Sequence, residues 1–322
     1  MFFLISLIAT APICGQSFAS EEVFIIPKND LLPESVGLNK STGAFYVGST
    51  RNGTITKIDK NGRQSVFVRS GEFGQWMVIG IKVDAERNEL WFCSSGGNNL
   101  IGYDKTDKKE GRPAGIFKVN LRSGKLIKKY TLETPGEVHF FNDLKIDANG
   151  NVYASHMFRE HGIYVIDQKE DRLKPFVASE LIKYPNGLDI SDNRKYLFVA
   201  HSEGLAKIDI SSREVTNLTV PEGVKVKYRE SIDGLYYYKW SLIGIQADIN
   251  TITRYYLNDE GNGISKVETL EANHPKMDHP TTGVIVNDEF YYVANAQFQK
   301  VNDDGTIDQR LSDPTILKIK LK

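Results

Sequence analysis

The chain has 322 residues, of which 40% are hydrophobic and 25% are charged, the proportions of an ordinary globular protein. Its 40 basic and 41 acidic residues give a formal net charge of -1. Because neither charge is in excess, neither a nucleic acid nor an acidic membrane surface is expected as a partner.

The first 19 residues have the composition of an export signal. They carry no charged side chain, and their apolar stretch, residues 2–13, is too short to span a bilayer. Ser17 and Ala19 place small residues at the two positions that a signal peptidase reads. We predict a signal peptide over residues 1–19, export to the periplasm or the extracellular space, and no stable membrane association after cleavage. An uncleaved anchor is the alternative, because no Lys or Arg precedes the apolar stretch.

A two-strand pattern recurs six times after this segment. Each copy has a small or polar residue, an apolar strand, a turn and a second apolar strand, as in ESVGLN…FYVGS and NGLDIS…LFVAH. The copies start at intervals of 44 to 63 residues, which is typical of the blades of a β-propeller. We call the first residues of the copies the inner column: Glu34, Ile79, Asn142, Asn186, Asp233 and Thr282.

Two further strands are predicted in most copies from alternating and β-branched residues. Third strands are expected at residues 53–59, 115–120, 162–167, 204–210, 250–257 and 315–321. Fourth strands are expected at residues 64–68, 126–132, 172–177, 214–218 and 264–270. The sixth copy lacks a fourth strand, and residues 22–28 would complete it and leave no open edge. The sequence thus predicts one all-β domain over residues 20–322, a six-bladed β-propeller of four-stranded blades closed by the N-terminal strand.

Two polar insertions interrupt the repeat, at residues 96–114 and 296–313. Both follow a second strand, whose end returns to the face where the first strand began. They should therefore overhang the mouth that holds the inner column, where loops on a rigid scaffold often bind ligands. The alternative is that they are tolerated surface insertions, since long loops cost little free energy.

Four inner-column residues carry oxygen atoms that suit a metal ion. Glu34 and Asp233 bring carboxylates, and Asn142 and Asn186 bring amide oxygens. In a propeller these positions face one central axis, and such oxygens are the ligands that Ca²⁺ takes. No cysteine or histidine occupies the column, so a soft metal is not favoured. The alternative is that Asn and Asp simply cap the turns before the strands.

The ends of the second strands form what we call the outer column: Ser49, Ser95, His156, His201, Gln246 and Asn295. Strand alternation predicts that these side chains ring the same mouth, farther from the axis. His156 and His201 are then catalytic candidates for proton transfer near neutral pH, and Gln246 and Asn295 are candidates for substrate binding. Histidines with only rim hydrogen bonds are the alternative. His139 and His279, each three residues before an inner-column residue, are weaker candidates.

Cys93 is the one cysteine of the predicted mature chain, so no internal disulfide can form. It lies within the apolar run LWFCSS, and we expect a buried structural thiol rather than a nucleophile.

Four motifs resemble the regucalcin/gluconolactonase family of six-bladed propellers, which includes senescence marker protein and luciferin-regenerating enzyme. They are PESV at 33–36, NDLKID at 142–147, PNGLDIS at 185–191 and IDGL at 232–235. The resemblance covers nearly all of the predicted mature chain; paraoxonase and strictosidine synthase are more distant relatives. It implies metal ligation by Glu34, Asn186 and Asp233, with Asn142 beside the metal and the substrate. It also implies hydrolysis of a lactone or related ester with a divalent metal, often Ca²⁺.

The sequence departs from the family in ways that leave three hypotheses open. The substrate-binding arginine of gluconolactonases has no clear match, and the two insertions remodel the mouth. The favoured hypothesis is an exported, Ca²⁺-dependent hydrolase of a small lactone or ester. The first alternative is a secreted, non-enzymatic binding propeller with a structural metal, and the second is a strictosidine-synthase-like enzyme without a metal. The oligomeric state is left open.

Overall fold

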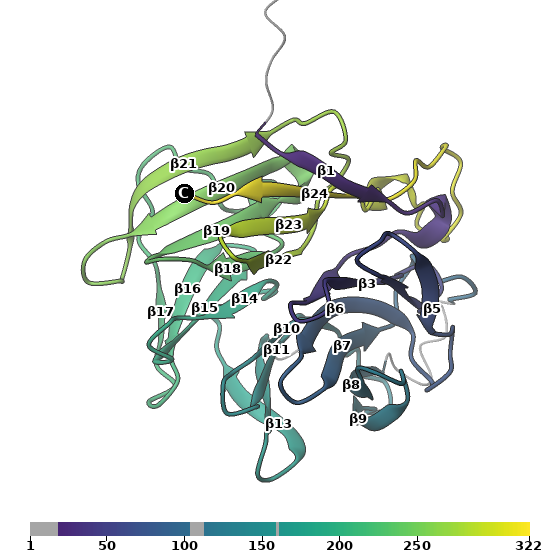
Figure 1. The fold of residues 1–322 in the computed structure, drawn as a ribbon. Helices are drawn as coiled ribbons and strands as arrows, with labels where there is room; N and C mark the ends of the chain where they lie inside the picture. Colours follow the sequence, from purple (N-terminus) through teal and green to yellow (C-terminus); the bar gives the residue numbers. More distant parts are fainter. Residues whose placement is uncertain (1–18, 104–112, 159–160) are drawn as a thin grey trace, which may run out of the picture.

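The computed structural model describes residues 19–103, 113–158 and 161–322. The predicted signal peptide therefore lies almost wholly outside the described residues, as does the middle of the first insertion. Six four-stranded sheets surround a common axis, and neighbouring strands in each sheet are antiparallel (Figure 1). The predicted six-bladed β-propeller is confirmed.

The first three blades follow one another along the chain, each built as a meander. Blade 1 contains β2 (Val36–Asn39), β3 (Ala44–Gly48), β4 (Ile55–Ile58) and β5 (Gln64–Val68). Blade 2 contains β6 (Met77–Asp84), β7 (Glu89–Ser95), β8 (Ala114–Asn120) and β9 (Leu126–Leu132). Blade 3 contains β10 (Phe141–Ile146), β11 (Val152–His156), β12 (Gly162–Asp167) and β13 (Arg172–Ala178).

The last three blades complete the ring. Blade 4 contains β14 (Leu188–Ile190), β15 (Tyr196–His201), β16 (Gly204–Asp209) and β17 (Val215–Asn217). Blade 5 contains β18 (Leu235–Tyr237), β19 (Ser241–Gln246), β20 (Thr251–Leu257) and β21 (Ile264–Ala272). Blade 6 contains β22 (Gly283–Val286), β23 (Glu289–Val293), β24 (Thr315–Lys320) and the N-terminal β1 (Glu21–Ile25).

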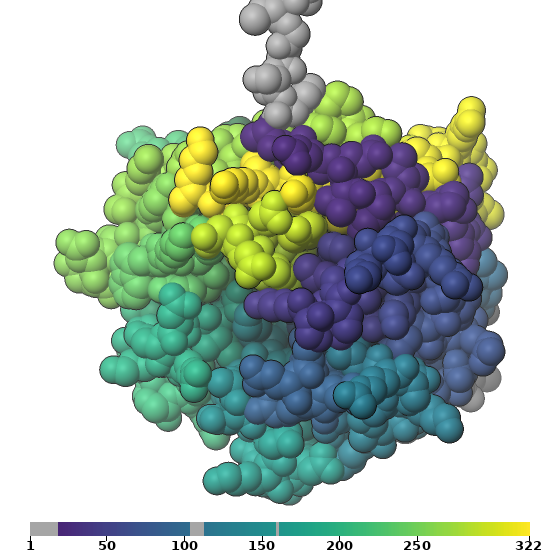
Figure 2. Space-filling model, viewed as in Figure 1, coloured from purple at the N-terminus to yellow at the C-terminus, as the bar shows by residue number. Residues whose placement is uncertain are grey.

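The ring is closed by pairing of the two ends of the chain. β1 is antiparallel to β24, with Glu21 opposite Lys318 and Ile25 opposite Thr315. Figure 2 shows the purple N-terminal segment lying against the yellow C-terminal segment. The prediction that an N-terminal strand completes the last blade is confirmed, and β24 gains a partner on what would otherwise be its open edge.

Side-chain caps shape the turns between the third and fourth strands of several blades. The side-chain oxygens of Asn120, Asp167 and Asp209 each accept hydrogen bonds from the backbone N–H groups two and three residues later. Such Asx turns fix the reversal locally, so each meander is specified by its own short sequence.

The hydrophobic core lies between adjacent blades rather than at one centre. Trp91 and Ile116 of blade 2 pack in one cluster with Phe141 and Val152 of blade 3. Equivalent clusters join blades 4 and 5, and blades 6 and 1. Cys93 is fully buried in the first of these clusters, as expected for a structural thiol. This arrangement leaves the axis to the polar residues of the first strands.

Helices are few and short in the described residues. Four single-turn 3-10 helices lie in loops: Asn29–Leu31, Tyr228–Glu230, Ala247–Ile249 and Phe298–Lys300. Within this described part, no helix has the length and apolar character needed to cross a membrane.

Candidate functional site

A cavity of about 490 Å³ opens at one end of the propeller axis. We call it the axial cavity. Its wall contains the four oxygen-bearing residues of the inner column, Glu34, Asn142, Asn186 and Asp233. Both insertions also contribute, through residues 96–99 and through Phe298. The structure thus brings together the predicted metal-binding residues beneath the loops that were expected to overhang them.

Close packing of first-strand backbones holds the inner column in place. The Gly187 N–H donates to the Asp233 carbonyl at 2.8 Å, which ties blade 4 to blade 5. A Cβ at Gly187 would lie 2.4 Å from that carbonyl oxygen, and one at Gly234 would lie 2.8 Å from the Thr281 carbonyl oxygen. Glycine follows Asn186 and Asp233 in the sequence because neighbouring backbones approach too closely for a side chain.

A β-bulge positions Asn142. The pairing of β10 with β11 shifts register between Phe141 and Leu144, so Asn142 and Asp143 lie in the irregular step. A bulge re-aims the side chains that it carries, and it recurs in blade 2 between Val78 and Ile81. There the inner-column residue is Ile79, which is fully buried and supplies no ligand.

Thr282, the sixth member of the inner column, holds the backbone of Glu34 by a hydrogen bond. Its Oγ1 donates to the Glu34 carbonyl at 2.8 Å, and the Thr281 hydroxyl donates to the same oxygen at 2.6 Å. These bonds fix the backbone of Glu34 across the junction of blades 6 and 1.

Ionisation of the two carboxylates is costly in this environment. Burial, and then the negative charges of Asp233 and Asp143, hold the pKa of Glu34 well above its usual value. Burial also raises the pKa of Asp233 to about 7, although a hydrogen bond from the Asn186 side chain acts in the opposite direction. A cation bound between the two carboxylates would remove this cost.

Two amide oxygens beside the carboxylates are left without partners. Oδ1 of Asn142 and Oδ1 of Asn186 are buried and accept no hydrogen bond from any described residue. The other end of the Asn142 amide is fixed, because Nδ2 lies 3.0 Å from the Met157 sulfur. A buried, unpaired carbonyl oxygen is costly unless something binds it, and a cation would do so here.

The donor set fits a hard divalent cation. Its four inner-column members are two carboxylates and two amides, which offer the oxygen ligands that Ca²⁺ takes. Asp248, His279, Met77 and Met157 line other parts of the cavity. Among the described residues there is no cluster of three or more His, Cys, Asp or Glu side chains that could hold a metal ion. A cation bound here would take the amide oxygens together with the carboxylates, a mixture that Ca²⁺ accepts readily.

The outer column lies inside the blades rather than on the cavity surface. All six of its side chains are buried, and none lines the axial cavity. Ser49 donates to the Leu31 carbonyl, Gln246 to the carbonyls of Lys225 and Glu230, and Asn295 to the Asp313 carbonyl. The loops entering each blade cover these strand ends, and the buried polar groups bind the loop backbones. This placement differs from the predicted rim.

The two outer-column histidines are likewise embedded. Nε2 of His156 lies 3.2 Å from Nδ1 of His139, and the His156 ring packs edge-to-face against Phe141. His201 accepts the Glu203 N–H at 3.3 Å, and burial lowers its pKa. Their catalytic roles, and the substrate-binding roles of Gln246 and Asn295, stay predictions that the geometry does not favour.

His279 is the histidine that the structure places on the axial cavity. Its Nδ1 lies 3.4 Å from Oδ1 of Asp248 and next to the Gln299 amide, and its ring contacts Phe298. Its backbone has a left-handed φ of 64°, an uncommon conformation for a bulky residue. Burial lowers its pKa, against the opposing charges of Asp248 and Asp278, and so favours the neutral imidazole.

Several cavity residues had no sequence signal. Arg229 and Ser231 line the wall from the long loop between blades 4 and 5, which has no equivalent in the repeat. An apolar part of the wall lies beside Asn142, formed by Met77, Phe140, Met157 and Phe158. The rings of Phe140 and Phe158 meet edge-to-face at 5.6 Å. The positively charged side chain of Arg229 and the aromatic rings of Phe140 and Phe158 thus line the same cavity as the oxygen ligands.

No family model matches the chain, and no curated protein matches it by sequence. Among solved structures, it is similar to a gluconolactonase from Xanthomonas campestris, with a TM-score of 0.59 and 11% identity over 90% of this chain and 86% of that one. It is similar to a luciferin-regenerating enzyme, with a TM-score of 0.65 and 14% identity over 94% and 95% of the two chains. The chain shares the propeller fold of these proteins.

A third neighbour shows that the fold alone does not fix the function. The allergen Mala s 1 of Malassezia sympodialis has a TM-score of 0.67 and 13% identity, covering 93% of this chain and 96% of the allergen. Neighbours at such low identity establish architecture, whereas chemistry must be argued from the site itself.

Proposed function

We propose that this chain is a hydrolase of a small lactone or related ester, and that it works with one divalent cation, Ca²⁺ by preference. The cation would be held by Glu34, Asn142, Asn186 and Asp233. The observation that carries the proposal is the pair of buried, unpartnered amide oxygens beside two carboxylates whose ionisation is costly. The propeller fold shared with a gluconolactonase supports it.

When bound, the cation would polarise the substrate carbonyl and stabilise the negative charge that develops on its oxygen. The residues of the chain supply the proton transfers. Asp233 lies on the cavity wall beside Asn186, where its carboxylate can take a proton from the attacking water. Water then adds to the carbonyl carbon, the acyl–oxygen bond breaks, and the departing alkoxide recovers a proton.

His279 is a second group able to move that proton. The Gln299 amide and the Asp248 carboxylate both lie at Nδ1 and orient the ring, and the residue lines the axial cavity. An imidazole that lines a cavity, that is oriented through one ring nitrogen and whose pKa is lowered by burial suits the role of a general base. We assign His279 this role in preference to the embedded His156 and His201.

Small molecules of limited size fit the site as substrates, because the cavity is about 490 Å³ and residues of both insertions line it. We further propose that the chain is exported, on the strength of its uncharged, apolar first 19 residues.

The test is hydrolysis of a panel of small lactones and esters by residues 20–322, first in Ca²⁺ and then in chelator. Turnover that chelator abolishes, and that Asp233→Asn also abolishes, is the expected result. Asp189→Asn is the matched control: this buried aspartate belongs to the first strand of blade 4 but pairs with Lys145 away from the axial cavity.

Other outcomes would point elsewhere. Ca²⁺ binding without turnover of any panel member would favour the binding propeller with a structural metal. Full activity and full Ca²⁺ affinity in Asp233→Asn would refute the assignment of the site. Turnover that is indifferent to chelator would favour a metal-free reaction of the strictosidine-synthase kind.

A further inference from the structure

A buried ion pair closes the propeller axis behind the axial cavity. Lys82 of β6 places its Nζ 2.7 Å from Oδ1 of Asp143, which follows the ligand Asn142 in β10. The Asp143 side chain is fully buried and that of Lys82 is 16% exposed. The ammonium also lies 6.0 Å from the centre of the Tyr236 ring, a further favourable contact for a cation.

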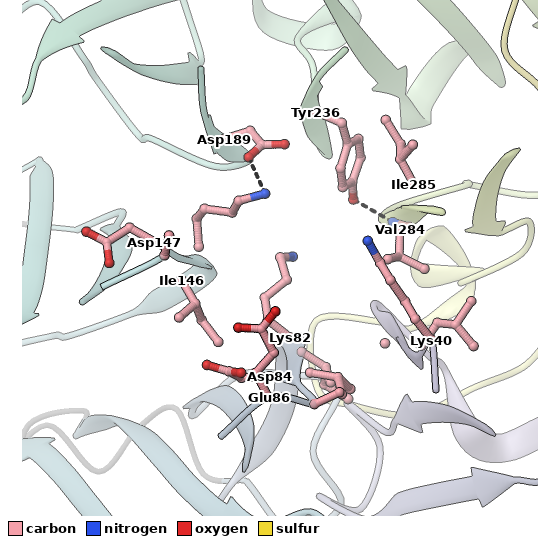
Figure 3. A pocket seen from close by; sticks show the side chains of 18 of the residues that line it. Lys40, Lys82, Asp84, Glu86, Ile146, Asp147, Asp189, Tyr236, Val284 and Ile285 are labelled. Carbon is pink, nitrogen blue, oxygen red and sulfur yellow. Dashed lines mark hydrogen bonds and ion pairs between the residues drawn. The ribbon is translucent and has the colours of Figure 1, made fainter. Parts of the chain in front are cut away.

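Lys82 reaches this position from the other end of the axis. Its side chain lines a separate cavity of about 620 Å³, which we call the opposite cavity. Figure 3 shows Lys82 pointing into the middle of that cavity, with Tyr236 beside it. The neighbouring Lys145 is already paired with Asp189 at 2.5 Å. Lys82 is therefore the cation that faces the interior carboxylate.

Asp143 is a third buried carboxylate near the proposed metal site, besides Glu34 and Asp233. Its Oδ1 accepts the Lys82 ammonium and the Leu144 N–H, whereas its Oδ2 is buried and has no partner among the described residues. Its negative charge acts on both Glu34 and Asp233, and the charge of Lys82 acts on Glu34 in the opposite direction. The ion pair thus lies within electrostatic reach of the ligands.

We propose that Lys82 is a built-in counter-cation that sets the affinity of the axial site for its divalent ion. This inference rests on the proposed function, because it concerns the same site. Lys82 neutralises Asp143, so of the three buried carboxylates the cation meets the charges of Glu34 and Asp233 alone. Asp248, on the cavity wall, is 45% exposed and is not part of the pair. In a buried environment one unit charge near a divalent ion changes its binding strongly, so the two halves of the pair must have opposite effects.

The test is calorimetric titration of Ca²⁺ into residues 20–322 at pH 8 for the wild type and four variants. Lys82→Met exposes the site to an unneutralised Asp143, and we expect the Kd to fall on the order of tenfold. Asp143→Asn leaves the ammonium unpaired beside the site, and we expect the Kd to rise on the order of tenfold. The double variant removes both charges and should bind within roughly threefold of the wild type. Lys82→Arg keeps the charge and is the matched control, with unchanged affinity expected.

A purely structural ion pair would give a different pattern. Lys82→Met and Asp143→Asn would then both lower the thermal stability while leaving the Kd unchanged, or would both weaken binding; either result overturns the inference alone. Binding by Lys82→Met when the wild type binds no Ca²⁺ supports the inference and refutes the metal site of the native chain. Absence of binding in every variant overturns both proposals. If Lys82→Met fails to fold, Asp143→Asn and the double variant still show whether the Kd changes in the expected direction.

Discussion

Glu34 and Asp233 are held where ionisation is costly, and this cost links the protonation of the site to the stability of the chain. In both groups burial is the principal cause of the raised pKa. A carboxylate with a raised pKa binds more protons in the folded state than in the unfolded state between its two pKa values. The stability of the cation-free chain therefore falls as the pH rises through that window.

For Asp233 the window extends from about 4, the ordinary value, to about 7. In chelator, we expect these residues to make the chain less stable at pH 8 than at pH 5, and Asp233→Asn to remove part of that loss. Saturating Ca²⁺ should raise the melting temperature at pH 8 by several degrees and raise it much less at pH 5, where protons compete with the cation. Thermal unfolding at the two pH values measures this. An equal Ca²⁺ effect at both would contradict the electrostatic account.

The histidines can be separated by their surroundings. His279 lines the axial cavity beside Asp248, whereas His201 is enclosed in its blade. On any substrate found in the panel, His279→Gln should lower kcat by about 10²-fold, the effect expected for loss of a general base, with the Ca²⁺ affinity unchanged. His201→Gln, the control, should lower the melting temperature but leave kcat near that of the wild type. Normal turnover in His279→Gln would rule out His279 as the base and leave that role to Asp233.

At the scale of elements, the repeat predicts the first strands well and their surroundings poorly. Each strand follows its own apolar run and turn signal, so its position could be inferred from local sequence. The position of the inner column could be predicted because propeller symmetry brings equivalent first residues to one axis. The surroundings of the outer column could not be predicted, because alternation gives the direction of a side chain but not what covers it. Loops such as 225–230 bury these strand ends.

Irregular elements explain the other omissions. The register shift in β10 breaks the alternation that a count along the strand assumes, so the inward direction of Asp143 could not be read from the sequence. Arg229 lies in a loop that no other blade repeats. Lys82 belongs to no motif that points to a site, and only the folded chain shows that it contacts Asp143.

The close approach of first strands gives a prediction at this scale. Gly187→Ala would place a Cβ 2.4 Å from the Asp233 carbonyl oxygen, so the strands must separate. We expect a loss of more than about 2 kcal/mol of stability, together with weaker Ca²⁺ binding because Asp233 moves. Gly62→Ala is the control: its φ of 80° is strained for alanine, but no atom lies within 4 Å. That change should cost about 1 kcal/mol and leave Ca²⁺ binding intact. A loss of binding no larger for Gly187→Ala than for Gly62→Ala would count against the packing argument.

For the whole molecule, closure of the ring joins the start of the described chain to two blades. The Ser20 N–H donates to Oε2 of Glu271 at 2.8 Å, and the Tyr292 hydroxyl donates to the Ser20 hydroxyl at 2.8 Å. Both Ser20 and Glu271 are buried. Cleavage after Ala19, as the first residues predict, would turn the Ser20 nitrogen into an ammonium group facing a buried carboxylate. Processing would then strengthen the contact that fixes the last blade, because the hydrogen bond to the carboxylate would gain the attraction between two opposite charges in a buried environment.

Two forms of the chain should therefore differ in stability. A chain that begins at Ser20 should melt roughly 2 °C or more above one that carries an additional N-terminal methionine, which leaves Ser20 with a neutral amide. Glu271→Gln should remove most of the difference, since it removes the negative charge that attracts the ammonium group. Thermal unfolding of the four proteins near pH 7, where the α-ammonium is charged, forms a double-mutant cycle. A difference that persists in Glu271→Gln would show that the added methionine acts by crowding the junction of blades 5 and 6, and not through the charge of the new N-terminus.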